Sequence, residues 1–118
     1  MNLNSFNPYF NHHSYHIFFM NLANPLKIGI IISLREKGKN VREITDNLHM
    51  EQSKISHALA SLRKCHIVKI KQEGKHRIYY LNKKTIVPMF NILDKHANIY
   101  CPNKCNASED CGCEECRK

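Results

Sequence analysis

The chain has 118 residues and a formal net charge of +8, from 18 lysines and arginines against 10 aspartates and glutamates. This length predicts one domain, with much surface left exposed unless a partner subunit covers it. No apolar run approaches the roughly 20 residues that span a bilayer, and the first charged side chain, Lys27, comes too late for a secretory signal, so we expect a cytoplasmic protein.

The positive charge is concentrated in one stretch of the chain. Residues 35–84 carry 13 basic and 5 acidic side chains, which accounts for the whole excess. A concentrated basic surface suits a polyanion such as nucleic acid. A lysine-rich genome would give the same composition, so the charge alone leaves both explanations open.

The first 24 residues contain no acidic side chain, no lysine and no arginine, but several aromatic ones. Such a composition argues against a disordered tail. We expect a helix over about residues 13–22 whose apolar face packs against this subunit or a second one. His12, His13 and His16 belong to this region and are expected to be polar groups of a packed helix rather than metal ligands.

The next helix has clear boundary signals. Asn24 is a suitable N-cap, and Pro25 takes the first helical position, where a missing N–H costs nothing. The helix is expected to end near Gly38. Apolar residues recur between these limits at helical spacing: Leu26, Ile30, Ile31 and Leu34.

Two further helices complete a helix-turn-helix pattern. A short helix over residues 41–48 is followed by a turn at His49-Met50, and Ser53 is expected to open the third helix. The third helix has apolar side chains at i, i+4 and i+7, which predicts a buried stripe: Ile55, Leu59 and Leu62.

The hydrophobic period then changes to that of strands. Residues 67–71 and 77–81 are rich in β-branched and aromatic side chains and flank a turn over residues 72–76, in which Gly74 is available for a positive φ. After Asn82 the helical pattern returns. This last helix is too apolar along one side for the surface of a monomer: Ile86, Met89, Phe90, Leu93 and Ala97.

A helix that runs into a basic hairpin is the layout of a recognition helix and a wing, which predicts binding to double-stranded DNA. A helix fits the major groove, and its N-terminal residues reach base edges. Each polar side chain taken singly fits a solvated surface, but the helix and hairpin together favour DNA. The predicted DNA-binding residues are Gln52, Ser53, Lys54, Ser56, His57, Lys75, His76 and Arg77.

Three stretches of the chain are informative in combination: Leu22-Ala23-Asn24-Pro25, Ser53-x-x-Ser56-His57-x-Leu59-x-x-Leu62 and Glu73-Gly74-Lys75-x-x-x-Tyr79-Tyr80-Leu81. They give residues 22–100 a resemblance to the ArsR/SmtB family of winged-helix metal-sensing repressors. The resemblance implies a homodimer built on the first and last helices, a two-fold operator in double-stranded DNA, and an inducer that weakens DNA binding. The expected fold is α+β, mostly α. A winged helix-turn-helix domain spans residues 1–100, with an N-terminal helix or arm over 1–24 and a dimerisation helix over 83–100.

The metal positions of that family are not reproduced within the expected domain. One family site would fall on residues 39–43, which contain no cysteine. Another would fall on Lys83, Thr85, His96 and Ile99, of which only His96 is a metal-ligand type. A single histidine cannot build a tetrahedral site, so His96 is expected to be a polar position on the dimerisation helix.

Residues 101–118 form a cysteine-rich tail. Thiolates select zinc, other soft metal ions or iron–sulfur clusters, although the spacing here is not that of a standard zinc ribbon. We expect a thiolate-bound metal, with an iron–sulfur cluster and reversible disulfides as alternatives. Cys65 is expected to be a small buried hydrophobe. The predicted metal ligands are Cys101, Cys105, Cys111, Cys113 and Cys116.

These patterns predict a dimeric, sequence-specific transcriptional repressor whose DNA affinity is modulated by metal at the C-terminal cysteines. Two alternatives stay open: a regulator that senses redox state or carries an iron–sulfur cluster, and a DNA-binding adaptor whose tail is a structural zinc module. An enzyme is not expected, because the sequence offers no Gly-rich phosphate loop and no acid/base pair.

Overall fold

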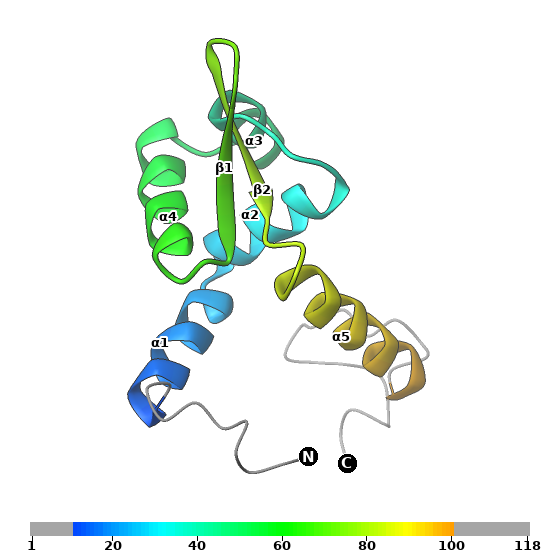
Figure 1. Ribbon diagram of the computed structural model, residues 1–118. Coiled ribbons are helices and arrows are strands. Elements are labelled where there is room, and N and C mark those ends of the chain that lie inside the picture. The colour runs from blue at the N-terminus through cyan, green and yellow to red at the C-terminus, as the bar shows by residue number, and fades with distance from the viewer. Residues whose placement is uncertain (1–10, 101–118) are drawn as a thin grey trace. The chain divides into compact units, whose positions relative to one another are not determined.

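The computed structural model describes residues 11–100 as a mostly helical chain with one small antiparallel sheet (Figure 1). The described residues belong to two compact units, one ending at Asn82 and the other beginning at Lys83. The elements are α1 (His12–Ala23), α2 (Pro25–Glu36), α3 (Val41–Leu48), α4 (Gln52–Lys64), β1 (Val68–Glu73), β2 (His76–Leu81) and α5 (Ile86–Tyr100). The expected winged helix-turn-helix order is therefore present.

Helices α1 and α2 each begin at an asparagine cap. The side chain of Asn11 accepts a hydrogen bond from the backbone N–H of Ser14 at 3.1 Å, and Asn24 accepts from the N–H of Lys27 at 3.1 Å. Pro25 occupies the first turn of α2, where its missing donor is not needed. The N-cap predicted at Asn24 is confirmed.

The turn between α3 and α4 is set by a left-handed residue. His49 has φ 53° and its N–H bonds to the carbonyl of Thr45 at 2.8 Å, which ends α3. Helix α4 begins at Gln52, one residue before the predicted Ser53. Glu51 is the N-cap and makes no side-chain capping bond, so this start carries no side-chain signal that the sequence could reveal.

Strands β1 and β2 pair antiparallel from Val68↔Leu81 to Glu73↔His76. The turn is only Gly74-Lys75, shorter than the predicted residues 72–76, because the pairing continues to the last residue before Gly74. Gly74 has φ 60°, as the sequence predicted, and glycine adopts this conformation without steric cost.

The hairpin is attached to the loop before α3 by a backbone bridge. The N–H of Lys39 donates to the carbonyl of Tyr79 at 2.9 Å, and the N–H of Tyr79 donates back at 2.8 Å. The side chain of Lys39 is buried, and its Nζ donates to Asn47 Oδ1 at 2.7 Å and to Ser33 Oγ at 3.1 Å. A buried ammonium is tolerated because these bonds replace its hydration.

Helix α2 occupies the centre of the first unit, where it contacts α1, α3, α4 and β2. The stripe predicted on α4 is buried, with Ile55, Leu59 and Leu62 at 0%, 1% and 0% exposure. The remaining buried apolar side chains of the first unit are Ile30, Ile31, Leu34, Ile44, Ala58, Ile67, Val68, Tyr79 and Leu81.

Helix α5 begins at Ile86 and carries Pro88 within its first turn, as expected. From Ile92 to its end, α5 exposes four large apolar side chains: Ile92, Leu93, Ile99 and Tyr100. In the part of the chain that the structure describes, no single helix is long and apolar enough to cross a membrane. Helices α1 and α2 meet that test only as a pair, across a 75° bend.

Replacing Gly38 by alanine is expected to destabilise the first unit by about 1–3 kcal/mol, as overpacking does. A Cβ at this position would lie 2.8 Å from Ile78 Cγ2 and 3.2 Å from the carbonyl oxygen of Tyr79. Urea unfolding followed by circular dichroism measures the change. The matched control is Gly29→Ala in α2, where the new Cβ makes an ordinary 3.5 Å contact with Leu48 and helix propensity favours alanine. An equal loss in both variants would contradict the close-packing argument.

Candidate nucleic-acid interface

The rotation of α4 about its own axis is fixed by its buried stripe. Because Ile55, Leu59 and Leu62 face the core, the opposite side of the helix faces outward. All five predicted DNA-binding residues of the helix are exposed: Gln52, Ser53, Lys54, Ser56 and His57. They occupy the first half of α4, which is the part of a recognition helix that reaches base edges.

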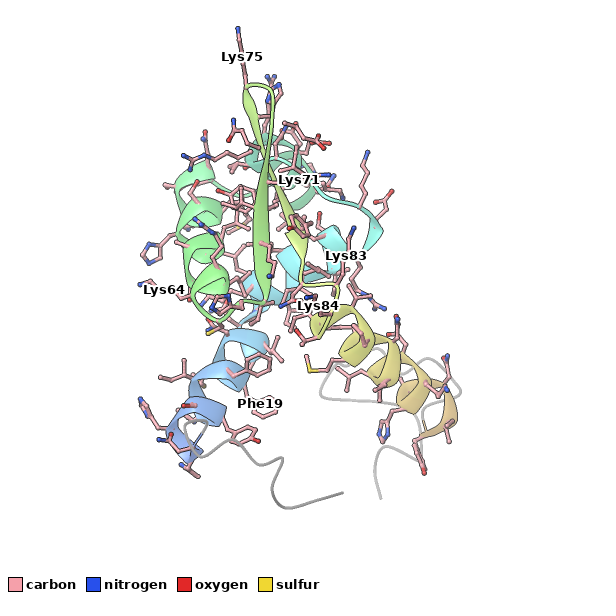
Figure 2. The ribbon with its side chains drawn as sticks, in the orientation of Figure 1. Phe19, Lys64, Lys71, Lys75, Lys83 and Lys84 are labelled. Carbon is pink, nitrogen blue, oxygen red and sulfur yellow. The ribbon has the colours of Figure 1, made fainter. Side chains whose placement is uncertain are left out.

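The tip of the hairpin carries the second predicted group. Lys75, His76 and Arg77 are exposed, and Figure 2 shows Lys75 extending from the tip away from the helices. Lys71 and Glu73 form an ion pair at 2.9 Å on the hairpin surface. This pair contributes little to stability because both side chains are 57% exposed.

A polar network that the sequence did not reveal holds the last turns of α4 against α1 and α2. Asn21 Oδ1 accepts from Lys27 Nζ at 2.7 Å and from Ser61 Oγ at 2.9 Å, and Lys27 Nζ also donates to Ser61 Oγ at 3.0 Å. The Asn21 amide donates to Cys65 Sγ at 2.9 Å. One side chain from α1, one from α2 and two from the end of α4 therefore share a single set of bonds.

This network corrects the expectation for Cys65. It is half-buried rather than a buried hydrophobe, and its sulfur accepts a hydrogen bond. The sequence signal was Asn21, a polar residue at the end of an apolar helix, which is only 6% exposed. Lys27 is six residues away, but Ser61 and Cys65 lie 40 and 44 residues further along the chain, so no local pattern could identify those two partners.

No group of three or more histidine, cysteine or acidic side chains converges on a possible metal site within residues 11–100. His12, His13 and His16 are exposed on α1, and His96 is exposed on α5 with its ring 4.8 Å from that of Tyr100. The predicted thiolate ligands lie outside the described residues: Cys101, Cys105, Cys111, Cys113 and Cys116.

Comparisons with known proteins match the segment that contains the helix-turn-helix. The family model described as "Bacterial regulatory protein, arsR family" matches residues 24–69. The HTH-type transcriptional repressor SmtB of Mycobacterium tuberculosis is 35% identical over 60 residues, which are 51% of this chain and 44% of the repressor. The chain therefore spans less than half the length of that relative. An uncharacterized HTH-type transcriptional regulator of Methanocaldococcus jannaschii is 32% identical over 78 residues, 65% of this chain and 88% of that protein.

A solved structure shares the fold at lower sequence identity. The homodimeric winged helix-turn-helix DNA-binding domain of a Mycobacterium bovis protein superimposes with a TM-score of 0.68 at 18% identity. The match covers 80% of this chain and 87% of that one. These matched proteins are described as transcriptional regulators or DNA-binding domains, which agrees with the expectation of a non-enzymatic role.

Replacing Asn21 by alanine is expected to cost about 1–3 kcal/mol of stability, because the Lys27 ammonium and the Ser61 hydroxyl lose a buried acceptor. Denaturant unfolding of the full chain measures the change. The matched control is Asn91→Ala, at an exposed asparagine in α5, where no more than about 0.5 kcal/mol is expected. If the two variants unfold at the same urea concentration, the network does not hold the helices together.

Proposed function

The chain belongs to the arsR family of bacterial regulatory proteins, and from this membership we propose that it is a dimeric repressor that binds double-stranded DNA. One observation carries the proposal. The first half of α4 exposes a run of polar and basic side chains, and the hairpin that follows ends in Lys75, His76 and Arg77, all exposed. Helix α4 enters the major groove, and the hairpin tip lies on the adjacent backbone or minor groove.

The side chains of α4 divide into base-reading and phosphate-binding groups. Gln52 has the amide that pairs with the edge of adenine, while Ser53, Ser56 and His57 are hydrogen-bonding groups without a single preferred base. Lys54 binds phosphates, which fix the position of the protein on the duplex and carry no sequence information. Arg63 and Lys64, exposed in the last turn of α4, extend this phosphate-binding group.

A homodimer explains the apolar surface of the two terminal helices. Helix α1 exposes four large apolar side chains, and α5 exposes as many, and such surfaces are usually covered by a partner. The Mycobacterium bovis protein with the same fold is described as homodimeric. Pairing would place two copies of α4 about 34 Å apart, one turn of DNA. The exposed apolar side chains of α1 are Tyr15, Ile17, Phe19 and Met20.

The proposed inducer is a soft metal ion bound by the thiolates of residues 101–118. Five cysteines supply more sulfur donors than the three or four that such an ion needs. The tail directly follows α5, so metal binding acts on the dimerisation helix. It changes DNA affinity only as far as the ion prefers one dimer form over the other. An iron–sulfur cluster or a redox-active set of thiols is the alternative occupant of the same segment.

Replacing Gln52 and replacing Lys75 are expected to weaken DNA binding in different ways. Gln52→Ala relaxes the preference at one base pair by about 1–3 kcal/mol, whereas Lys75→Ala weakens binding to all sequences and lowers the salt slope by about 1. Binding is measured by fluorescence anisotropy, using the best duplex that the wild type selects from a random pool and a scrambled duplex. Lys37→Ala, an exposed lysine at the end of α2, is the control. If Gln52→Ala leaves the sequence preference unchanged, α4 does not read bases as proposed.

Replacing Cys111 and Cys113 together by serine is expected to abolish the metal response. In the wild type, saturating zinc or another soft ion changes DNA affinity by about 5–150-fold, and the double variant binds DNA equally with and without metal. Metal content and the absorption spectrum of anaerobically purified protein distinguish an ion from a cluster. Cys65→Ser is the control and keeps the response. A wild type whose DNA binding ignores both metal and oxidation leaves the structural-zinc adaptor as the remaining explanation.

A further inference from the structure

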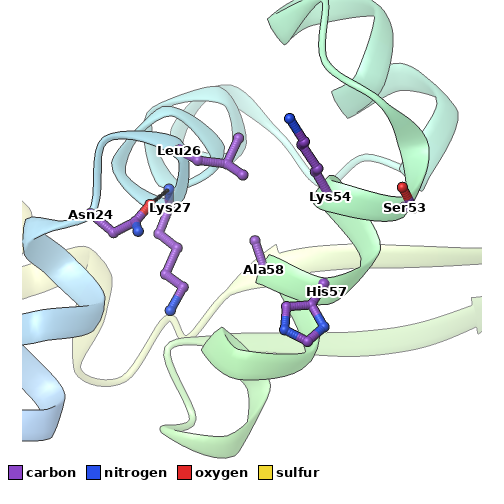
Figure 3. A pocket seen from close by; sticks show the side chains of 7 residues that line it. All are labelled: Asn24, Leu26, Lys27, Ser53, Lys54, His57 and Ala58. Carbon is purple, nitrogen blue, oxygen red and sulfur yellow. Dashed lines mark hydrogen bonds between the residues drawn. The ribbon is translucent and has the colours of Figure 1, made fainter.

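A groove of about 530 Å³ lies between the first turn of α2 and the first half of α4 (Figure 3). Apolar atoms make up most of the exposed lining, although five of the seven lining side chains are polar or basic. The lining residues are Asn24, Leu26, Lys27, Ser53, Lys54, His57 and Ala58.

The ionisable side chains that line this groove are all basic. Its lining includes two lysines and a histidine but no carboxylate. Lys54 and His57 are exposed. Lys27 Nζ uses two of its three donors on Asn21 and Ser61, and its charge remains beside the groove. An anionic occupant therefore complements the lining, and a cationic one does not.

The groove lies along one flank of α4. Lys54 and Ser56 are two residues apart, so they project about 160° apart around the helix axis. Lys54 lines the groove, and Ser56 does not. A helix about 10–12 Å across fills a major groove about 12 Å wide. Each flank of such a helix therefore meets one of the phosphate backbones that wall the major groove.

We infer that the groove between α2 and α4 seats the phosphate backbone of one DNA strand, which makes the first turn of α2 a second DNA-contacting element. The inference rests on the proposed DNA binding and extends it to residues that precede the helix-turn-helix. The phosphates lie between Lys54 on one side and the Leu26–Lys27 turn on the other. Phosphate binding of this kind adds affinity without sequence preference.

The test is a charge series at Leu26, which is half-buried at the groove. Leu26→Gln, Leu26→Glu and Leu26→Lys alter packing similarly and differ in charge. With a phosphate in the groove, the glutamate variant binds the selected duplex about 3–10-fold more weakly than the glutamine variant, and the lysine variant binds more tightly. The slope of log affinity against log salt becomes steeper by about 0.9 for each additional phosphate that a variant neutralises, and shallower by the same amount for each phosphate lost. The preference for the selected over the scrambled duplex stays unchanged.

The matched control is the pair Ile32→Gln and Ile32→Glu, at an exposed position on the same helix. Ile32 is six residues beyond Leu26, about 9 Å along the axis, which exceeds the screening length of about 8 Å at physiological salt. This pair is expected to differ less than twofold in DNA affinity. Equal charge effects at both positions, or three Leu26 variants of equal affinity, overturn the inference.

Phosphate ethylation interference with the wild-type chain gives a second measurement that does not depend on a variant folding. For the wild type, we expect phosphates beside the major-groove site whose ethylation blocks binding. Their interference signals persist in Lys75→Ala and weaken in Lys54→Gln. If every sensitive phosphate is lost with Lys75, the groove holds no backbone. A wild type that selects a duplex while the Leu26 series is flat removes this inference alone. A wild type that binds no duplex removes the proposed function as well.

Discussion

The packing of α4 on the core is the constraint on which the rest of the interface depends. A helix residue is rotated by about 100° from its neighbour, so burying a different stripe would turn the polar side chains inward. Ile55, Leu59 and Leu62 are almost completely buried, which makes any other rotation costly in apolar exposure. The packing of the core therefore determines that the predicted DNA-contacting face points outward. Contacts made by that face are not required to orient it.

Two buried polar networks supply directional hydrogen bonds, which the apolar packing lacks, between the packed elements. Lys39, in the loop before α3, connects α2, α3 and the hairpin through its ammonium and its backbone. Asn21 connects α1, α2 and the end of α4. Apolar surfaces can slide over one another at small cost, but a satisfied buried polar group has few alternative partners. The networks therefore hold the wing and the recognition helix in register with the helices behind them.

The sequence predicted those features that depend on local chemistry. The cap at Asn24, the turn at His49, the positive φ of Gly74 and the buried stripe of α4 all follow from residue type and spacing. The start of α4 was misplaced because no side chain caps it, and the turn was overestimated because strand pairing continued through polar residues. The partners of Asn21 and the groove beside Leu26 depend on contacts between distant segments, which spacing along the chain does not encode.

The backbone bridge between Lys39 and Tyr79 anchors the hairpin to the core at Tyr79, some distance from its tip. Beyond Tyr79 the strand residues towards the tip are half-buried or exposed, and the four residue-to-residue steps from Tyr79 to Lys75 extend about 13 Å at the usual rise of a strand. The tip can therefore bend without opening the core, at the cost of only its own solvated bonds. A duplex whose groove width varies from one sequence to another meets a wing that adjusts to it, while the helix beside the core stays rigid.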